Sequence, residues 1–119
     1  MAAIKSCTDI PQSKKLAKVL PLESANMYYD RYGTPSFINE YVSLKNIKND
    51  KYKHLIPCWS LAALLDILPP IEGFRPIIDL DINLIRYEGN YRDELCFNGN
   101  NLVDACVAMI EKLHEIKMI

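Results

Sequence analysis

Several sequence signals that mark common enzyme classes are absent from this chain. It contains no glycine-rich phosphate loop, no dinucleotide-binding fingerprint and no histidine-rich metal motif. Its four cysteines include no Cys-x-x-Cys pair, so a zinc site built from cysteines is not expected. These absences favour a protein without a metal or cofactor, and a role other than catalysis.

Long apolar runs and an excess of one charge are also absent. No stretch reaches the roughly 20 apolar residues that span a membrane, and the first residues lack the apolar core of a signal peptide. The formal net charge is -1, so no overall basic field attracts nucleic acid. We therefore expect a cytoplasmic protein with reduced thiols, without a membrane partner and without nucleic acid as its main partner.

The composition is that of an ordinary globular protein. Among 119 residues, 50% are hydrophobic and 24% are charged. A chain of this length can bury a hydrophobic core without disulfide or metal staples. We expect one α+β domain over residues 1–119, in which residues 1–12 form a loose arm.

The chain is organised around residues 56–70, the most apolar run, which holds the only tryptophan. Pro57 suits the first position of a helix, and Pro69 and Pro70 would end it. Apolar residues recur at helical spacing, so the run predicts a helix buried on several sides. The expected core face comprises Cys58, Leu61, Leu65 and Leu68.

Four further elements are expected around this helix. Ser13 can cap a short N-terminal helix that carries Leu16, Val19 and Leu20. Alternation of apolar and polar residues predicts a strand over residues 78–84, and residues 91–97 can return as its antiparallel partner. Asn101 can cap a last helix over residues 102–117, whose apolar face comprises Leu102, Val103, Cys106, Met109, Ile110, Leu113 and Ile116. The predicted fold is two main helices and a short N-terminal helix packed on a small antiparallel sheet; residues 36–55 fit a helix or a strand equally well.

The candidate binding residues are aromatic. Trp59 is either a stacking platform for a ligand or a core anchor beside the expected helix start. Tyr28, Tyr29 and Tyr32 form either a recognition surface, because tyrosine is enriched at interfaces, or a short strand whose rings cover the edge of the core. The lysine-bearing stretch Lys45–Lys53 is either a phosphate-binding segment or a solvated loop.

Two weaker patterns could carry chemistry. Cys58 at a helix N-terminus, four residues after His54, could be an activated nucleophile. However, no oxyanion loop or third orienting group is visible, and a packed cysteine is the better interpretation of this position. Asp79, Asp81 and Asn83 begin like a calcium loop, but Leu84 and Asn90 occupy the positions that require glycine and glutamate. The solvent face of a strand is the better interpretation of these three residues.

Three segments of the chain resemble a known family. They are Leu20-Pro-Leu-Glu-Ser-Ala-Asn-Met27, Ile56-Pro-Cys-Trp-Ser-Leu-Ala-Ala-Leu-Leu65 and Asn101-Leu-Val-Asp-Ala-Cys-Val-Ala-Met-Ile-Glu-Lys-Leu113. The family consists of short uncharacterised bacterial proteins, found in gut bacteria and their mobile DNA. In that family the last segment usually reads Asn-Pro-Val-Asp-Ala-Cys, and Leu102 stands here in place of the proline. The resemblance implies a bacterial protein linked to mobile DNA, and it implies no catalytic residues.

Three hypotheses for the function follow from the residues. The first is a non-enzymatic accessory or protein-interaction domain that associates with itself, most simply as a symmetric dimer, or with another protein. The second is a small-ligand or nucleic-acid-binding module that uses Trp59, the three tyrosines and Lys45–Lys53. The third is a cysteine-dependent enzyme that uses Cys58 with His54. The supply of apolar surface favours the first hypothesis, because large exposed apolar patches usually mark an interface.

Overall fold

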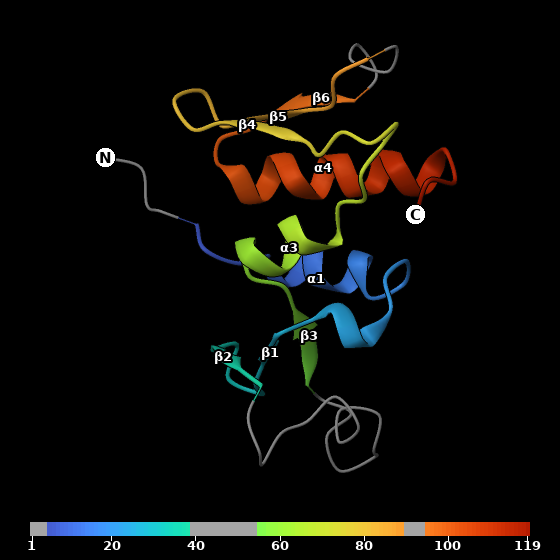
Figure 1. Cartoon of the computed structure of the whole chain (residues 1–119). Helices are drawn as coiled ribbons and strands as arrows, with labels where there is room; N and C mark the ends of the chain where they lie inside the picture. The colour runs from blue at the N-terminus through green and yellow to red at the C-terminus, as the bar shows by residue number, and fades with distance from the viewer. Residues whose placement is uncertain (1–4, 39–54, 90–94) are drawn as a thin grey trace. The chain divides into compact units, whose positions relative to one another are not determined.

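The computed structural model of the chain describes residues 5–38, 55–89 and 95–119. These residues form three α-helices, a short 3-10 helix and two three-stranded antiparallel sheets (Figure 1), so the protein is α+β as expected. Two sheets therefore take the place of the single small sheet that was predicted. The chain divides into two compact units: an N-terminal unit of residues 7–63, and a C-terminal unit of residues 64–119 with residues 1–6.

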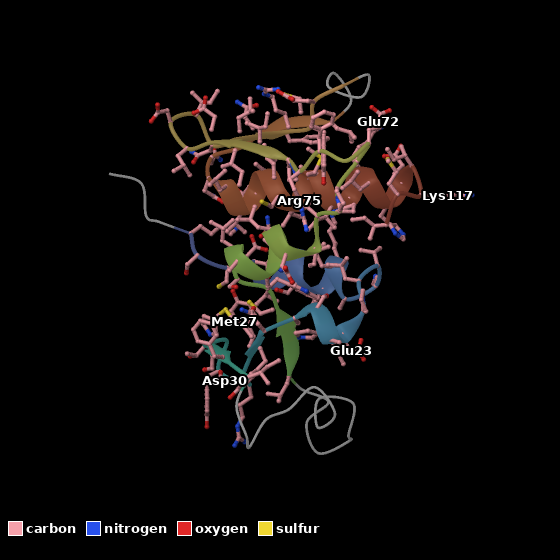
Figure 2. The ribbon with its side chains drawn as sticks, viewed as in Figure 1. Glu23, Met27, Asp30, Glu72, Arg75 and Lys117 are labelled. Carbon is pink, nitrogen blue, oxygen red and sulfur yellow. The ribbon has the colours of Figure 1, made fainter. Side chains whose placement is uncertain are left out.

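The sheet of the N-terminal unit has the strand order β2-β1-β3. β1 (Met27–Tyr29) lies at its centre and pairs antiparallel with β2 (Pro35–Phe37) and with β3 (Ile56–Cys58). The short strand considered for the tyrosines is thus present as β1, and Figure 2 labels its first residue, Met27, and Asp30, the residue that follows it. A central position screens β1 from solvent along both of its edges.

A tight turn joins β1 to β2. The Oδ1 atom of Asp30 accepts hydrogen bonds from the backbone N–H groups of Tyr32 and Thr34, at 2.8 and 3.0 Å. Gly33 has a φ of +77° there, a conformation that glycine adopts without steric cost. Asp30 and Gly33 together therefore allow the chain to reverse between β1 and β2.

The first helix, α1 (Ile10–Leu16), begins four residues earlier than predicted. Asp9 is its cap: its side chain accepts the N–H of Gln12 at 2.8 Å, and the Gln12 side chain accepts the N–H of Asp9 at 3.1 Å. This reciprocal capping box satisfies two helix-end amides at once. The predicted cap, Ser13, lies inside the helix and is buried, so that assignment was wrong.

The segment before α1 belongs to the N-terminal unit from residue 7 onward. Cys7 pairs with Ser60 in an antiparallel β-bridge, and the N–H of Thr8 donates to the carbonyl of Trp59 at 2.9 Å. Residues 7–12 are therefore tied to the chain, in contrast to the expected arm. Residues 1–4 of that arm lie outside the described residues.

The central run forms a strand and then a helix, which corrects the prediction of one continuous helix. β3 places Pro57 opposite Tyr28 at the edge of the sheet, where a missing N–H costs no ladder hydrogen bond on the open side. α3 (Leu61–Ile67) follows, and Ser60 Oγ accepts the N–H of Ala63 at 3.2 Å at its start. The predicted helix start and the placement of Cys58 at a helix N-terminus were both wrong.

The buried face of α3 also differs from the one predicted. Leu64 and Leu68 are fully buried, whereas Leu61 and Leu65 are half-buried. The predicted face was drawn through Cys58, but α3 begins only after residue 60. Cys58 therefore does not belong to the helix. Two residues of the predicted core face, Cys58 and Leu68, are fully buried, but Cys58 lies on β3 and Leu68 follows the last residue of α3.

The sheet of the C-terminal unit has the strand order β4-β5-β6. β4 (Ile77–Asp79), β5 (Leu84–Arg86) and β6 (Cys96–Asn98) are antiparallel, with Ile85 of β5 opposite Ile78 and Phe97. β6 contains Cys96 and Phe97 of the return strand that was expected over residues 91–97, and it is antiparallel as expected; residues 91–94 lie outside the described residues. The expected single strand over 78–84 was wrong, since a turn over residues 80–83 divides it.

The turn between β4 and β5 arises from local side-chain chemistry. Asp79 Oδ1 accepts the N–H of Asp81 at 3.0 Å, a side-chain turn that competes with the strand ladder. Asn83 has a φ of +50°, a left-handed conformation that asparagine tolerates better than most residues. Polar residues that were assigned to the solvent face of a strand therefore make a hairpin turn instead.

The last helix, α4 (Leu102–Glu115), confirms the prediction. Asn101 Oδ1 accepts the N–H of Asp104 at 2.9 Å as the cap. The helix packs against β5 and β6 (Figure 1). The predicted apolar face is buried except at its C-terminal end, where Ile116 is half-buried. Lys5 Nζ lies 2.7 Å from Asp104 Oδ1 in the first turn.

Candidate functional site

Trp59 is fully buried in the N-terminal unit. Its indole Nε1 donates a hydrogen bond of 2.9 Å to Ser24 Oγ, in the 3-10 helix η1 (Leu22–Ser24). The ring has no solvent-facing side on which a ligand could stack. The core-anchor interpretation therefore describes this side chain, and the stacking-platform interpretation does not.

The three tyrosines do not form one surface. Tyr28 and Tyr29 are neighbours on β1 and therefore point to opposite faces of the sheet, where Tyr28 is half-buried and Tyr29 is buried. Tyr32 lies in the following turn with 80% of its surface exposed. The guanidinium carbon of Arg31 lies 5.4 Å from the centre of the Tyr32 ring. Of these three tyrosines, Tyr32 is therefore the one that offers most of its surface to a partner.

Cys7, Thr8, Tyr29 and Cys58 form a thiol cluster. The Tyr29 hydroxyl donates to the Thr8 carbonyl at 2.7 Å, and the Cys58 thiol donates to the same carbonyl at 3.5 Å. The Cys7 sulfur lies 3.9 Å from the Tyr29 hydroxyl. Sulfur atoms lie beside the labelled Met27 in Figure 2, and Met27, Tyr29 and Cys58 form one apolar cluster with Cys7 packed against it.

The electrostatics of the thiol cluster oppose a catalytic cysteine. Burial is the main cause that raises the pKa of Cys58 to about 11, and the neighbouring Cys7 raises it further, while a hydrogen bond from Thr8 lowers it. A nucleophilic cysteine needs the opposite shift, since the thiolate is the reactive form. Burial also raises the pKa of Tyr29. The proposed partner His54 and the stretch Lys45–Lys53 lie outside the described residues.

The most exposed apolar region of the C-terminal unit is the hairpin between β4 and β5. Leu80 is 73% exposed and Ile82 is 53% exposed, although both are aliphatic. They border a concave surface with a volume of about 450 Å³. We call its lining the hairpin surface; it comprises residues 77–82, Leu84 and Arg86.

The hairpin surface carries both signs of charge. Asp79 and Asp81 lie at the turn, where both side chains are exposed. Arg86 lies at the far end of β5, opposite Ile77, and its guanidinium approaches Glu88 at 4.0 Å. The apolar centre is thus flanked by acidic groups at one end and by a basic group at the other.

Sequence reasoning missed the hairpin surface because Leu80 and Ile82 were assigned to the buried face of a strand. One signal could have found it: Asp79-Leu-Asp-Ile-Asn83 holds three residues that favour turns, two of them aspartates. Apolar residues inside such a turn cannot be covered by the sheet. They are then expected at the surface.

The part of the chain that the structure describes contains neither a metal-binding cluster nor a membrane-spanning helix. No group of three or more histidine, cysteine, aspartate or glutamate side chains is arranged to hold a metal ion there. Asp79, Asp81 and Asn83 belong to β4 and its turn, and Asp79 is engaged by the backbone of Asp81. Within the same residues, no helix has the length and apolarity needed to cross a membrane.

Comparison with known proteins gives no relative: no family model, no curated protein and no solved structure matches the chain.

Proposed function

We propose that this protein is a non-enzymatic interaction domain that forms a symmetric dimer through the hairpin surface. The observation that carries the proposal is the exposure of Leu80 and Ile82 around a concave surface of about 450 Å³. Contiguous apolar surface rimmed by polar groups typically marks an interface. Trp59 is buried and hydrogen-bonded, so its ring offers no surface to a partner. The proposed interface therefore lies away from this residue.

The position of the hairpin in its sheet supports this proposal. α4 packs against β5 and β6, while β4 stands at the edge of the sheet. On β4, Ile77 and Asp79 are exposed and Ile78 between them is half-buried, so the strand presents an open face. Edge strands with apolar side chains are where folded chains most readily pair with one another.

The charge pattern favours a second copy of the chain as the partner. A two-fold axis at the apolar centre brings the acidic turn of one copy to the basic end of the other. Asp81 of each copy then faces Arg86 of its partner copy. Such a surface is self-complementary, which is what a closed two-fold interface requires.

The primary test measures mass by light scattering at micromolar concentration over an about tenfold dilution series, because dimer mass depends on concentration. We expect a mass above the monomer's 13.7 kDa that falls on dilution. Leu80→Asn combined with Ile82→Asn is expected to raise the dissociation constant by about tenfold or more, since each removes an apolar contact at the centre. A monomer mass at every concentration would contradict the proposal.

The matched control is Phe37→Asn in the N-terminal unit. Phe37 is 65% exposed and aromatic, so this change also removes an exposed apolar side chain. We expect it to leave the mass unchanged at every dilution. If the control weakened the dimer as much as the hairpin variants do, the association would be non-specific and hydrophobic. That result would contradict a defined interface.

A charge exchange tests the orientation of the two copies. Asp81→Arg or Arg86→Glu alone places like charges across the axis and is expected to weaken the homodimer about threefold to tenfold at low salt. An equal mixture of the two variants restores both attractive pairs, so it is expected to recover the dimer. Failure of the mixture to associate better than either variant would rule out this two-fold arrangement.

A further inference from the structure

Cys7 and Cys58 come from distant parts of the sequence and meet on one face of the N-terminal unit. Cys7 is opposite Ser60 in an antiparallel bridge, and Cys58 lies two positions before Ser60. Residues two apart on a strand share a face, so the two cysteines are diagonal neighbours. Cys7 also packs against the apolar cluster that contains Cys58.

The two thiols differ in access. Cys58 is fully buried, whereas Cys7 is half-buried and open to small reagents. Reversible disulfides commonly pair an accessible cysteine with a less accessible one that resolves the first product. The arrangement therefore has the two parts that a reversible thiol switch needs.

We propose that Cys7 and Cys58 form a reversible disulfide when the protein meets a low-molecular-weight disulfide such as glutathione disulfide. The Cys7 thiolate attacks one sulfur of the reagent, forms a mixed disulfide and releases one thiol. Cys58 then loses its proton and attacks the Cys7 sulfur, which forms the protein disulfide and releases the second thiol. Two protein thiols are oxidised and one reagent disulfide is reduced to two thiols, so the exchange balances.

The hydrogen bonds around Cys58 are compatible with this oxidation. The disulfide removes the thiol hydrogen that Cys58 donates to the Thr8 carbonyl at 3.5 Å. That carbonyl keeps the stronger donor, the Tyr29 hydroxyl at 2.7 Å. The Thr8 carbonyl therefore keeps a hydrogen-bond partner after oxidation. A buried acceptor that lost its only donor would make the disulfide costly to form.

The second step is the slow one at neutral pH. The groups that act on Cys58 are its burial, Thr8, Cys7 and Ser13, and together they raise its pKa to about 11. Few molecules therefore carry a Cys58 thiolate at neutral pH, and the mixed disulfide at Cys7 persists longer there. The rate of ring closure is expected to increase as the pH rises toward that pKa.

The disulfide would join the segment before α1 to β3. These are the two chain segments that the bridge between Cys7 and Ser60 holds by non-covalent contacts alone. A cross-link over so long a loop restricts the unfolded chain strongly. Oxidation is therefore expected to raise the resistance of the N-terminal unit to urea.

The experiment uses the full chain with Cys96→Ser, because Cys96 is exposed and would form its own mixed disulfide. The protein is treated with excess glutathione disulfide at mildly alkaline pH, digested and analysed by mass spectrometry. We expect Cys7 and Cys58 peptides joined by a disulfide, with the intact protein lighter by two hydrogen atoms. Dithiothreitol is expected to reverse both changes, and the urea midpoint of the oxidised protein to exceed that of the reduced protein.

Two variants separate the pair from a single reactive thiol. With Cys58→Ala, Cys7 is expected to hold one glutathione permanently; with Cys7→Ser, Cys58 is expected to stay reduced. A stable glutathione adduct on Cys7 while Cys58 is intact would overturn the proposal. So would complete lack of oxidation of both thiols after prolonged treatment, and neither result depends on the variants.

Discussion

β1 and β4 are both three-residue strands with apolar side chains, yet the folded protein uses them in opposite ways. β1 buries Met27 and Tyr29, which are 7% and 8% exposed, whereas Ile77 on β4 is 37% exposed. β1 lies between two strands, and β4 lies at an edge. For these two strands, the central position goes with burial and the edge position goes with exposure.

The turns that follow β1 and β4 also differ in the side chains that they expose. Each is closed by an aspartate that accepts backbone N–H groups, Asp30 after β1 and Asp79 at the end of β4. The first turn exposes Tyr32, whose ring faces the Arg31 guanidinium and whose hydroxyl is polar. The second exposes Leu80, which has no polar atom in its side chain. Burial against the proposed partner would therefore stabilise the second turn more than the first.

The largest expected effect separates the central strand from the edge strand. Tyr29→Ala removes a buried aromatic side chain and leaves a cavity, so it is expected to lower the free energy of unfolding by about 3–5 kcal/mol. Ile77→Ala on β4 is expected to change it by about 0.5 kcal/mol or less in the monomer, as at other surface sites. Urea denaturation of both variants measures the contrast. If both variants lost similar amounts of unfolding free energy, the position of the strand in its sheet would not explain the difference in burial energy.

The next effect concerns the buried thiol of each unit. Burial is the main cause that raises the pKa of Cys58 and the sole cause that raises that of Cys106, each to about 11 from an ordinary value of 9.0. The folded state then binds the proton more tightly than the unfolded state. The stabilisation is complete below about pH 9 and is lost as the pH rises toward 11, at about 1–3 kcal/mol for each thiol. Urea unfolding at a series of pH values should show this decline.

Single variants show which unit causes the loss of unfolding free energy at alkaline pH. Cys106→Ala removes the thiol of the C-terminal unit, so the fall in unfolding free energy between pH 9 and 11 becomes shallower. Cys58→Ala is expected to do the same for the N-terminal unit. A slope that neither variant changes would mean that other groups cause the alkaline loss.

A smaller effect compares the helix caps of the two units. Asp9→Ala in α1 and Asn101→Ala in α4 each leave a helix-end amide without its side-chain acceptor, and each is expected to cost about 0.5–2 kcal/mol. Lys14→Ala, at an exposed position of α1, is the control and is expected to change stability by about 0.5 kcal/mol or less. Urea midpoints at a constant denaturant slope measure all three. No loss at either cap would contradict the assigned capping roles.

Some elements with local signals were predicted well, although the cap at Asp9 and the turn at Asp79, whose signals are also local, were missed. The cap at Asn101 and the apolar face of α4 follow from residues three and four positions apart, and the structure confirms both. The turn at Gly33 follows from a single residue's conformational freedom. At residue 57 the local rule failed: proline is favoured at a helix start and is also tolerated on an edge strand, and the sequence does not distinguish the two.

The candidate site was predicted poorly for a related reason. Trp59 and Tyr29 were correctly identified as large aromatic side chains near the core, but their exposure depends on what covers them. Trp59 is closed off by its hydrogen bond to Ser24 from η1, a contact between segments far apart in the sequence. Leu80 and Ile82 share the alternating pattern of a buried strand, and only the turn at Asp79 places them in solvent.

The sequence by itself determined the α+β class and the last helix with its cap, because the periodicity and the cap of a helix depend on residues within a few positions of one another. Only the tertiary structure decided that Ile56–Cys58 joins β1 as a strand, that β4 is an edge strand, and that Cys7 meets Cys58. Each of these depends on pairing between distant segments, whose free energy is shared among many contacts and is encoded in no single stretch.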